Sequence, residues 1–172
     1  MRTTDGGKTW VGVYSKKAPS GDWSTTGLDV TTCYGVHFDP FDPKNMFISY
    51  TDIGLFASID GGVNWRSATK NGVPSKWDNT TYWMAFDPDV KGRAWAVMSS
   101  VHDLPRPKMW RDGSLSHSGG VCASDDSGKT WRVSTKGMPE TNATHIILDP
   151  KSPKDARTLY VAGFGTGVWK ST

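Results

Sequence analysis

Between Ser100 and Gly119 the sequence concentrates side chains that could bind or cut a polar polymer. The segment contains two His, two Asp, two Arg, one Lys and one Trp. An irregular insertion of this length inside a compact fold is typically either functional or disordered. Its two Pro residues and Trp110 argue against plain disorder. We therefore expect chemistry in this segment.

Carboxylates are the first candidates, because two of them placed across a bond can hydrolyse it by acid–base or nucleophilic catalysis. They stand well apart when a water must fit between them and closer together when one is a nucleophile. One of the pair acts as a protonated acid with a raised pKa. Three acids are predicted as catalytic candidates: Asp52, Asp103 and Asp112. Simpler roles stay open, since the first suits a turn before a Gly and the others suit ion pairs with neighbouring Arg residues.

A sugar ligand would need aromatic and polar contacts as well. Aromatic rings stack on the apolar faces of sugars, while charged and polar groups bond the hydroxyls. Seven residues are predicted to bind substrate: Trp77, Asp78, His102, Arg106, Trp110, Arg111 and His117. Either Trp could instead pack in the core. The two His residues have no clear third ligand, so surface positions suit them better than a metal site, and we expect no metal and no cofactor.

The elements that would position these residues are marked by an eight-residue pattern. Its copies begin at Thr3, Ser58 and Ser124, and a fourth begins at Ser171, where the sequence ends. Each has a hydroxyl first, Asp third, Gly fifth, Thr or Asn seventh and Trp eighth. Such Asp and hydroxyl side chains bond the N–H groups of a turn, and the Trp buries a ring beneath it. We predict a structural role for these octapeptides, carried by Asp5, Trp10, Asp60, Trp65, Asp126 and Trp131.

A second repeated element precedes the later octapeptides. It is an apolar strand that ends in Asp-Pro, then another apolar strand, then a Gly-apolar pair that leads into the octapeptide. The Asp-Pro strands cover 34–40, 82–88 and 145–150, and the strands after them cover 46–50, 94–99 and 158–163. With the short strand after each Trp, this makes a blade of four antiparallel strands.

Repeats of this length with four strands each predict an all-β fold, a β-propeller segment of about three blades without helices. The chain is expected to be one segment, 1–172. It would hold the end of one blade and a connection at 1–32, blades at 33–80 and 81–143, and a blade lacking its last strand at 144–172. Because connections alternate between strand ends, the Asp-Pro turns and octapeptides share one face. The candidate residues share the other.

The octapeptide resembles the Asp box (BNR repeat) of sialidase-type and related β-propellers. Together with the Asp-Pro strand and the Gly-apolar strand, it makes nearly the whole chain similar to the xyloglucanase-type glycoside hydrolases of family 74. The resemblance implies inverting hydrolysis of a β-glucan backbone by two Asp residues, one from each of two propellers. One partial propeller would hold at most one of them. The Arg-Ile-Pro element of sialidases does not occur in this sequence.

The predicted function is therefore a carbohydrate-active propeller, part of a secreted glycoside hydrolase that acts on a β-glucan or xyloglucan-type polysaccharide. The alternatives are a non-catalytic propeller that binds glycan or protein, and a sialidase-like Asp-box protein. Expected partners are a polysaccharide or oligosaccharide, and either the remaining propeller blades or a second copy of the chain.

Composition excludes other classes. The formal net charge is only +3 and the basic residues are scattered, which argues against nucleic-acid binding. No apolar run is long enough to cross a membrane. Arg2 and an octapeptide directly follow Met1, so no signal peptide is predicted, although the parent protein is expected to be extracellular or periplasmic. Cys33 and Cys122 lack zinc spacing, and a disulfide between them is left open.

Overall fold

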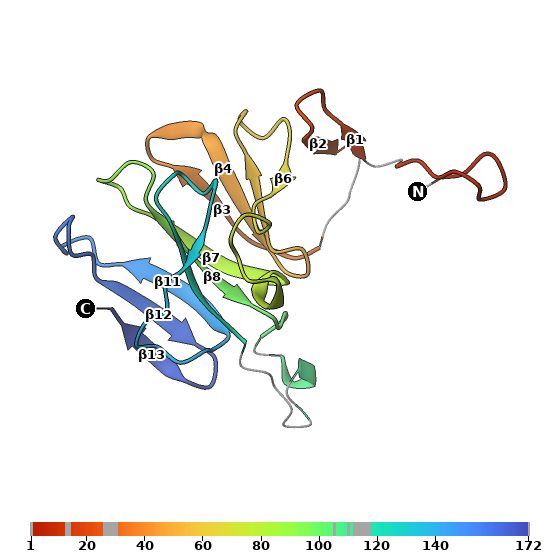
Figure 1. Cartoon of the computed structure of the whole chain (residues 1–172). Helices are drawn as coiled ribbons and strands as arrows, with labels where there is room; N and C mark the ends of the chain where they lie inside the picture. Colours follow the sequence, from red (N-terminus) through yellow and green to blue (C-terminus); the bar gives the residue numbers. More distant parts are fainter. Residues whose placement is uncertain are drawn as a thin grey trace.

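The protein is built almost entirely of antiparallel strands (Figure 1). The computed structural model describes residues 2–12, 15–25, 31–104, 106–109, 111 and 118–171. Within these residues the fold has two four-stranded sheets, one three-stranded sheet and one hairpin. The hairpin consists of β1 (Ser15–Lys17) and β2 (Trp23–Thr25). The first sheet consists of β3 (Cys33–Asp39), β4 (Asp42–Tyr50), β5 (Leu55–Ser58) and β6 (Arg66–Ser67), and the second of β7 (Thr80–Phe86), β8 (Ala94–Ser99), β9 (Gly119–Ser124) and β10 (Arg132–Val133). The third sheet consists of β11 (Ala143–Leu148), β12 (Leu159–Gly163) and β13 (Gly167–Lys170).

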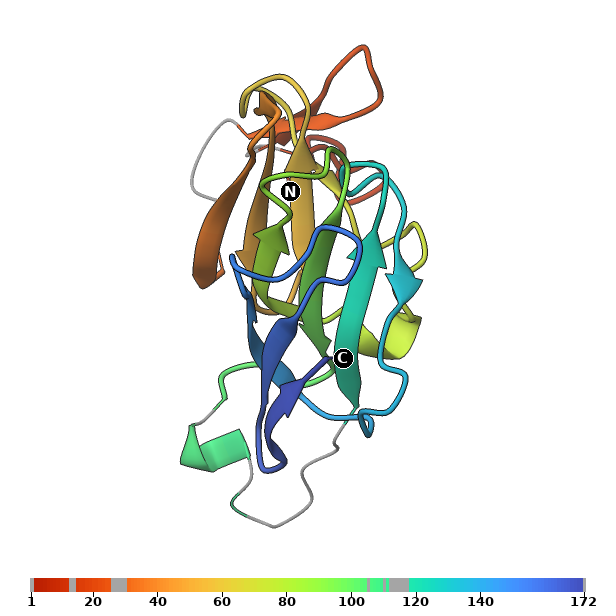
Figure 2. The same cartoon turned by 90° about the vertical axis from the view of Figure 1, so that its left-hand side faces the viewer.

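Each sheet runs in simple up-and-down order, and the sheets stand side by side as propeller blades (Figures 1 and 2). Their first strands form the inner row, in which β7 contacts both β3 and β11. The Trp83 ring lies between His37 and His145, with ring centroids 4.9 Å apart on each side. A Cβ at Gly35 would lie 2.9 Å from the Trp83 ring, so the glycine makes room for this row. The fold is thus the predicted all-β propeller segment.

The central sheet is buried on both faces, which explains its unbroken apolar sequence. Along β8, Ala94, Ala96 and Met98 face the sheet that begins with β3, while Trp95 and Val97 face the sheet that begins with β11. Every residue of β8 and β9 is buried. A strand covered on both sides needs no polar alternation.

The octapeptides form the expected turns. In the second copy, the Ser58 hydroxyl accepts a hydrogen bond from Gly62 N (2.8 Å), and the Asp60 carboxylate accepts from Asn64 N (2.9 Å) and Asn64 Nδ2 (2.7 Å). The bonds from Asn64 and then Ser58 lower the pKa of Asp60 to about 2. Gly62 has φ +90°, a conformation that residues with a Cβ rarely adopt.

The octapeptides lie beside the Asp-Pro turns, at the end of the sheets where we expected them. Gly61 N donates to Lys44 O (3.0 Å), and Ser127 N donates to Gly92 O (2.8 Å). Consequently, the β4–β5 connection and the segment after β8 lie at the opposite end.

Two local features differ from the expectations, and a third expectation is only partly covered by the described residues. The segment that begins at Ser15 was expected to be a plain connection, but it contains the β1–β2 hairpin. Trp23 of this hairpin pairs with Trp65, next to β6, through two backbone hydrogen bonds (3.0 and 2.6 Å). Single 3₁₀ turns occur at η1 (Ser75–Trp77) and η2 (Pro107–Met109) where no helix was predicted. The strand expected at 11–14 falls partly outside the described residues.

The two cysteines are not linked. Cys33 is exposed and Cys122 is buried, and both thiols are free. Burial raises the pKa of Cys122 to about 12, as expected for a residue of the core.

Candidate functional site

Two connections from neighbouring blades meet at the end of the sheets opposite the octapeptides. Asp52 follows β4, and His102 and Asp103 follow β8. His102 Nδ1 lies 3.2 Å from Asp52 Oδ1 and 3.7 Å from Asp103 Oδ2. Since β4 and β8 are the second strands of adjacent sheets, they end at the same face. The fold therefore brings together two of the three predicted acids and one predicted binding residue.

Asp52 is an accessible carboxylate on a tightly held turn. Its φ is +65°, which is uncommon for a residue with a side chain but tolerated by Asp. Thr31 Oγ1 donates to Asp52 Oδ2 (3.0 Å), and Gly54 N donates to Asn79 O (3.0 Å), which joins the turn to the next blade. The Asp52 side chain is 46% exposed. Asp52 therefore serves as the turn residue that the sequence suggested and still presents an accessible carboxylate.

Asp103 is held differently. Its φ is +57°, and its side chain is only 12% exposed. Its Oδ2 atom lies 3.1 Å from Arg106 Nη1 and 3.4 Å from Lys108 Nζ. Backbone strain of this kind is found at functional sites, and two residues with it share this cluster. Asp103 differs from Asp52 in having two basic side chains, Arg106 and Lys108, within 4 Å of one carboxylate oxygen.

Buried polar groups fix the start of the segment that carries His102 and Asp103. The Tyr82 hydroxyl accepts from Leu104 N (3.0 Å) and donates to Val101 O (3.1 Å). Tyr82 is buried, and burial raises its pKa. The Ser99 hydroxyl accepts from Val101 N (2.9 Å). These bonds hold the cluster on the rigid end of β8.

Replacing Tyr82 by Phe should loosen this segment without unfolding the sheets. The change removes one hydroxyl and leaves Leu104 N and Val101 O without that partner, which we expect to cost about 1–3 kcal/mol. Limited proteolysis should cut the segment after β8 faster in Tyr82→Phe, while the far-ultraviolet circular dichroism stays unchanged. Equal cutting rates would mean that the hydroxyl does not hold this segment.

Trp77 requires a correction, because its ring is not available to a sugar. The residue is only 4% exposed and belongs to the core between the first two blades. Turn η1 places the ring against Gly120, where an added Cβ would lie 3.1 Å from it. The indole N–H donates to Glu140 Oε1 (2.9 Å). The core role that the sequence left open for Trp77 is the one observed.

Glu140 is a carboxylate that sequence reasoning missed. It also accepts from the Ser118 hydroxyl (3.0 Å) and lies 2.6 Å from Lys76 Nζ. The bonds from Lys76, Trp77 and Ser118, in that order, lower its pKa to about 2. Glu140 therefore anchors the end of the segment that begins after β8. No repeated pattern marked it, since its partners come from two separate parts of the chain, 76–77 and Ser118.

The other predicted residues contribute less to this geometry. Asp78 forms an ion pair with Lys70 (3.4 Å), and its carbonyl lies against Gly54. Arg106 and Arg111 are exposed. Trp110, Asp112 and His117 lie outside the described residues.

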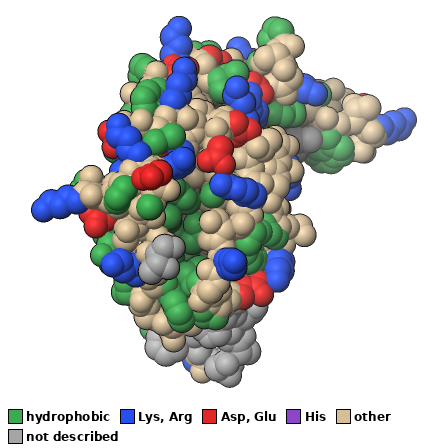
Figure 3. Space-filling view, turned by 60° about the vertical axis from the view of Figure 1, so that its left-hand side comes forward, with side chains coloured by type: hydrophobic (Ala, Val, Ile, Leu, Met, Phe, Trp, Pro, Cys, Tyr) green, Lys and Arg blue, Asp and Glu red, His purple; other side chains and the backbone are tan. Residues whose placement is uncertain are grey.

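The described residues show no feature typical of a nucleic-acid-binding surface, a metal site or a membrane-spanning helix. On the face shown in Figure 3, Lys and Arg are scattered among Asp and Glu rather than gathered in one patch. Within the described parts of the chain, no group of three or more His, Cys, Asp or Glu is arranged to hold a metal ion. In those same parts, no helix is long and apolar enough to span a bilayer.

Comparison with known proteins relates the chain to solved structures. No protein-family profile and no curated protein matches the sequence. The structure is similar to that of an ancestral GH74 enzyme, with a TM-score of 0.60 and 19% identity over 88% of this chain. It is also similar to a GH74 enzyme from Niastella koreensis (TM-score 0.54, 16% identity, 86% of this chain) and to the GH74 xyloglucanase from Xanthomonas campestris (0.50, 17%, 80%).

These likenesses establish the fold. The chain spans only 19%, 24% and 20% of the three enzymes, respectively. It therefore corresponds to a small part of each.

Proposed function

We propose that this chain is part of a carbohydrate-active propeller, within a secreted glycoside hydrolase that acts on a β-glucan or xyloglucan-type polysaccharide. In this proposal the octapeptide turns are Asp boxes that set the register of the blades. One observation carries the proposal: Asp52, His102 and Asp103 converge at the end of adjacent blades. The similarity to GH74 enzymes supports the same substrate class.

The different surroundings of the two acids suggest different roles. Asp103 contacts Arg106 and Lys108 and suits a carboxylate that supports the site through ion pairs. Asp52 is better exposed, contacts His102 and suits direct contact with a glycosidic oxygen or an attacking water. Asp52 Oδ1 and Asp103 Oδ2 lie 3.2 and 3.7 Å from His102 Nδ1, so the distance between these two oxygens cannot exceed the sum of the two values. Glycosidase pairs stand about 5–5.5 Å apart in retaining enzymes and about 6.5–9.5 Å in inverting ones.

The alternative is a propeller that binds glycan without cutting it. It is favoured by the ion pairs of Asp103, which a purely structural carboxylate would also form. In that case Asp52 and His102 would bond sugar hydroxyls, and the exposed Arg106 would add a further donor.

The two candidates separate in a paired assay. The chain is titrated with xyloglucan oligosaccharides and soluble β-glucans by calorimetry, with an α-glucan as the control ligand, and reducing ends are measured on the same samples. We expect saturable binding of a β-glucan and release of reducing ends. Binding without release would favour the non-catalytic propeller. Absence of both would contradict the proposed substrate class.

A further inference from the structure

The first strands of the three sheets share an irregular pairing at one place. In each strand the register of paired residues passes over a single residue: Tyr34 in β3, Tyr82 in β7 and Thr144 in β11. All three stand five positions before the Asp of an Asp-Pro turn. A residue left out of the pairing in this way forms a β-bulge, which bends the strand and can re-aim a side chain. The three blades thus repeat one bulge.

The bulges lie at the end of the inner row that carries the Asp52 cluster. Just before β3, Thr32 O accepts a hydrogen bond from Thr51 N (3.0 Å), so this strand begins beside the Asp52 turn. In β7, the bulged Tyr82 itself accepts from Leu104 N (3.0 Å) in the segment after β8. The bulged side chains of β3 and β7 therefore border the candidate site. Bulges are over-represented next to active sites.

The bulge in β3 changes the direction of Tyr34. In a regular strand Tyr34 would point to the same side as Val36, opposite to His37. Yet His37 and Tyr34 both contact β7: His37 lies against Trp83, and the Tyr34 ring lies against Tyr82. The bulge therefore aims Tyr34 towards the second blade, where the segment with His102 and Asp103 begins.

Tyr82 gives the Tyr34 ring a rigid support. The two ring centroids are 4.8 Å apart, and the ring planes are inclined by 32°. Tyr82 is only 5% exposed, and its hydroxyl is fixed by hydrogen bonds to Val101 O and from Leu104 N. Tyr34 itself is only partly buried. The result is an aromatic ring that is held in place and still partly accessible at the border of the site.

An aromatic contact is what a sugar ligand would need at this position. Of the two Trp residues predicted to stack on sugar, Trp77 is buried and Trp110 lies outside the described residues. Asp52 and His102 suit the hydroxyls of a sugar, but the faces of a glucosyl ring present C–H groups, which pack on aromatic rings. Tyr34 supplies such a ring, although the sequence indicated only a strand residue.

We propose that Tyr34 is a sugar-binding residue of the candidate site. A glucosyl ring of a β-glucan chain packs against the part of the Tyr34 ring that Tyr82 leaves uncovered, with its hydroxyls directed to Asp52 and His102. This inference rests on the function proposed above and adds an aromatic contact to it.

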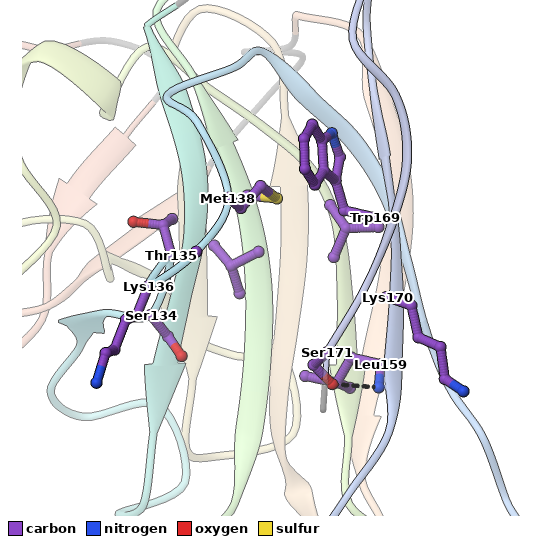
Figure 4. Close-up of a pocket in the computed structure, with 11 residues that line it drawn as sticks. Ser134, Thr135, Lys136, Met138, Leu159, Trp169, Lys170 and Ser171 are labelled. Carbon is purple, nitrogen blue, oxygen red and sulfur yellow. Dashed lines mark hydrogen bonds between the residues drawn. The ribbon is translucent and has the colours of Figure 1, made fainter.

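A cavity elsewhere in the molecule offers the competing position for a sugar ring. It has a volume of about 260 Å³ and lies between the last two sheets (Figure 4). Trp169 and Met138 line it, and Trp169 is also only partly buried. None of the three residues of the Asp52 cluster lines this cavity. A glycan bound there through Trp169 would therefore not need Tyr34.

Calorimetric titration with a xyloglucan oligosaccharide tests the role of Tyr34. We expect Tyr34→Leu to raise the dissociation constant about 5–10-fold, because it loses the stacking contact and keeps an apolar side chain. Tyr34→Phe keeps the ring and should bind like the wild type. Phe41→Leu is the matched control, since Phe41 is an exposed aromatic residue (42%) at the other end of the same sheet. Its affinity should also be unchanged.

The same titrations separate the possible failures. An unchanged dissociation constant in Tyr34→Leu, or a rise in Trp169→Leu instead, would overturn the assignment of Tyr34 and leave the proposed function standing. A wild type that binds no β-glucan would contradict the proposed function, and this inference with it.

A second measurement does not depend on the folding of any variant. In the complex of the wild type with the oligosaccharide, nuclear Overhauser contacts should join the ring protons of Tyr34 to the C–H protons of one glucosyl ring. A complex in which these contacts occur at Trp169, or at neither ring, would contradict the proposal.

Discussion

Replacing Asp87 by Asn is expected to lower the free energy of unfolding by about 3 kcal/mol or more, as is typical when one partner of a buried ion pair is removed. Asp87 is completely buried and receives two hydrogen bonds from Arg157, from Nε (2.8 Å) and Nη2 (2.7 Å). The two residues belong to neighbouring blades. The neutral side chain would remove the buried charge partner of the guanidinium and leave it only the more exposed Asp89, 2.6 Å from Nη2. Urea denaturation of the two proteins at pH 7 measures the difference.

The same variant should change how stability depends on pH. Burial alone would raise the pKa of Asp87, but the bonds from Arg157 and from Asp89 N outweigh it and lower the pKa. A folded-state pKa below the unfolded value of about 3.9 stabilises the protein above that value, and this stability is lost as the pH falls through the folded-state pKa. The loss of stability between pH 7 and pH 3 should therefore be smaller in Asp87→Asn.

Asp149 provides the control, because it holds the same place in the Asp-Pro turn of the last blade. Its carboxylate accepts from Lys151 N (2.9 Å), and it is only partly buried. Asp149→Asn should cost much less than Asp87→Asn. Equal costs would show that the turn, and not the contact between blades, explains the effect.

Replacing Asp52 by Asn is expected to slow the release of reducing ends by about 10²–10⁴-fold, the usual contribution of a general acid or base. The amide keeps the size of the side chain and can still bond sugar hydroxyls, so glycan affinity should change little. The measurement is the initial rate of release from the best β-glucan, together with the dissociation constant.

The control for Asp52→Asn is Asp42→Asn. Asp42 is an exposed acid at the other end of β4, where its carboxylate accepts from Lys44 N (3.0 Å). It should affect neither the rate nor the affinity. If Asp52→Asn retained the full rate, Asp52 would not be the reacting carboxylate.

The fold could largely be predicted because its pattern is local and repeated. The octapeptide bonds join residues two to four positions apart, so the turn at Asp60 depends on its own sequence. The strand expected at 94–99 is β8, with the predicted bounds. The order of strands follows from connections too short to reach a distant strand. The three-residue strands at Ser15 and Trp23 left no such signal.

The site could be predicted only in part, because its side chains are positioned by contacts between distant segments. Alternation of the connections placed Asp52 and Asp103 at one face, where both contact His102. Nothing local indicated that Trp77 would turn inward to Glu140, 63 positions later. The pairing of Asp87 with Arg157, 70 positions away, was equally hidden.

The central claim is that glycan binds at the end of the sheets that carries Asp52, His102 and Asp103. Chemical-shift mapping by nuclear magnetic resonance, with a xyloglucan oligosaccharide added to the isotopically labelled chain, tests it most directly. We predict saturable shifts at 51–54 and 100–104, with none at the octapeptide turns. Shifts confined to the octapeptide end, or no saturable shifts with any β-glucan, would contradict the claim.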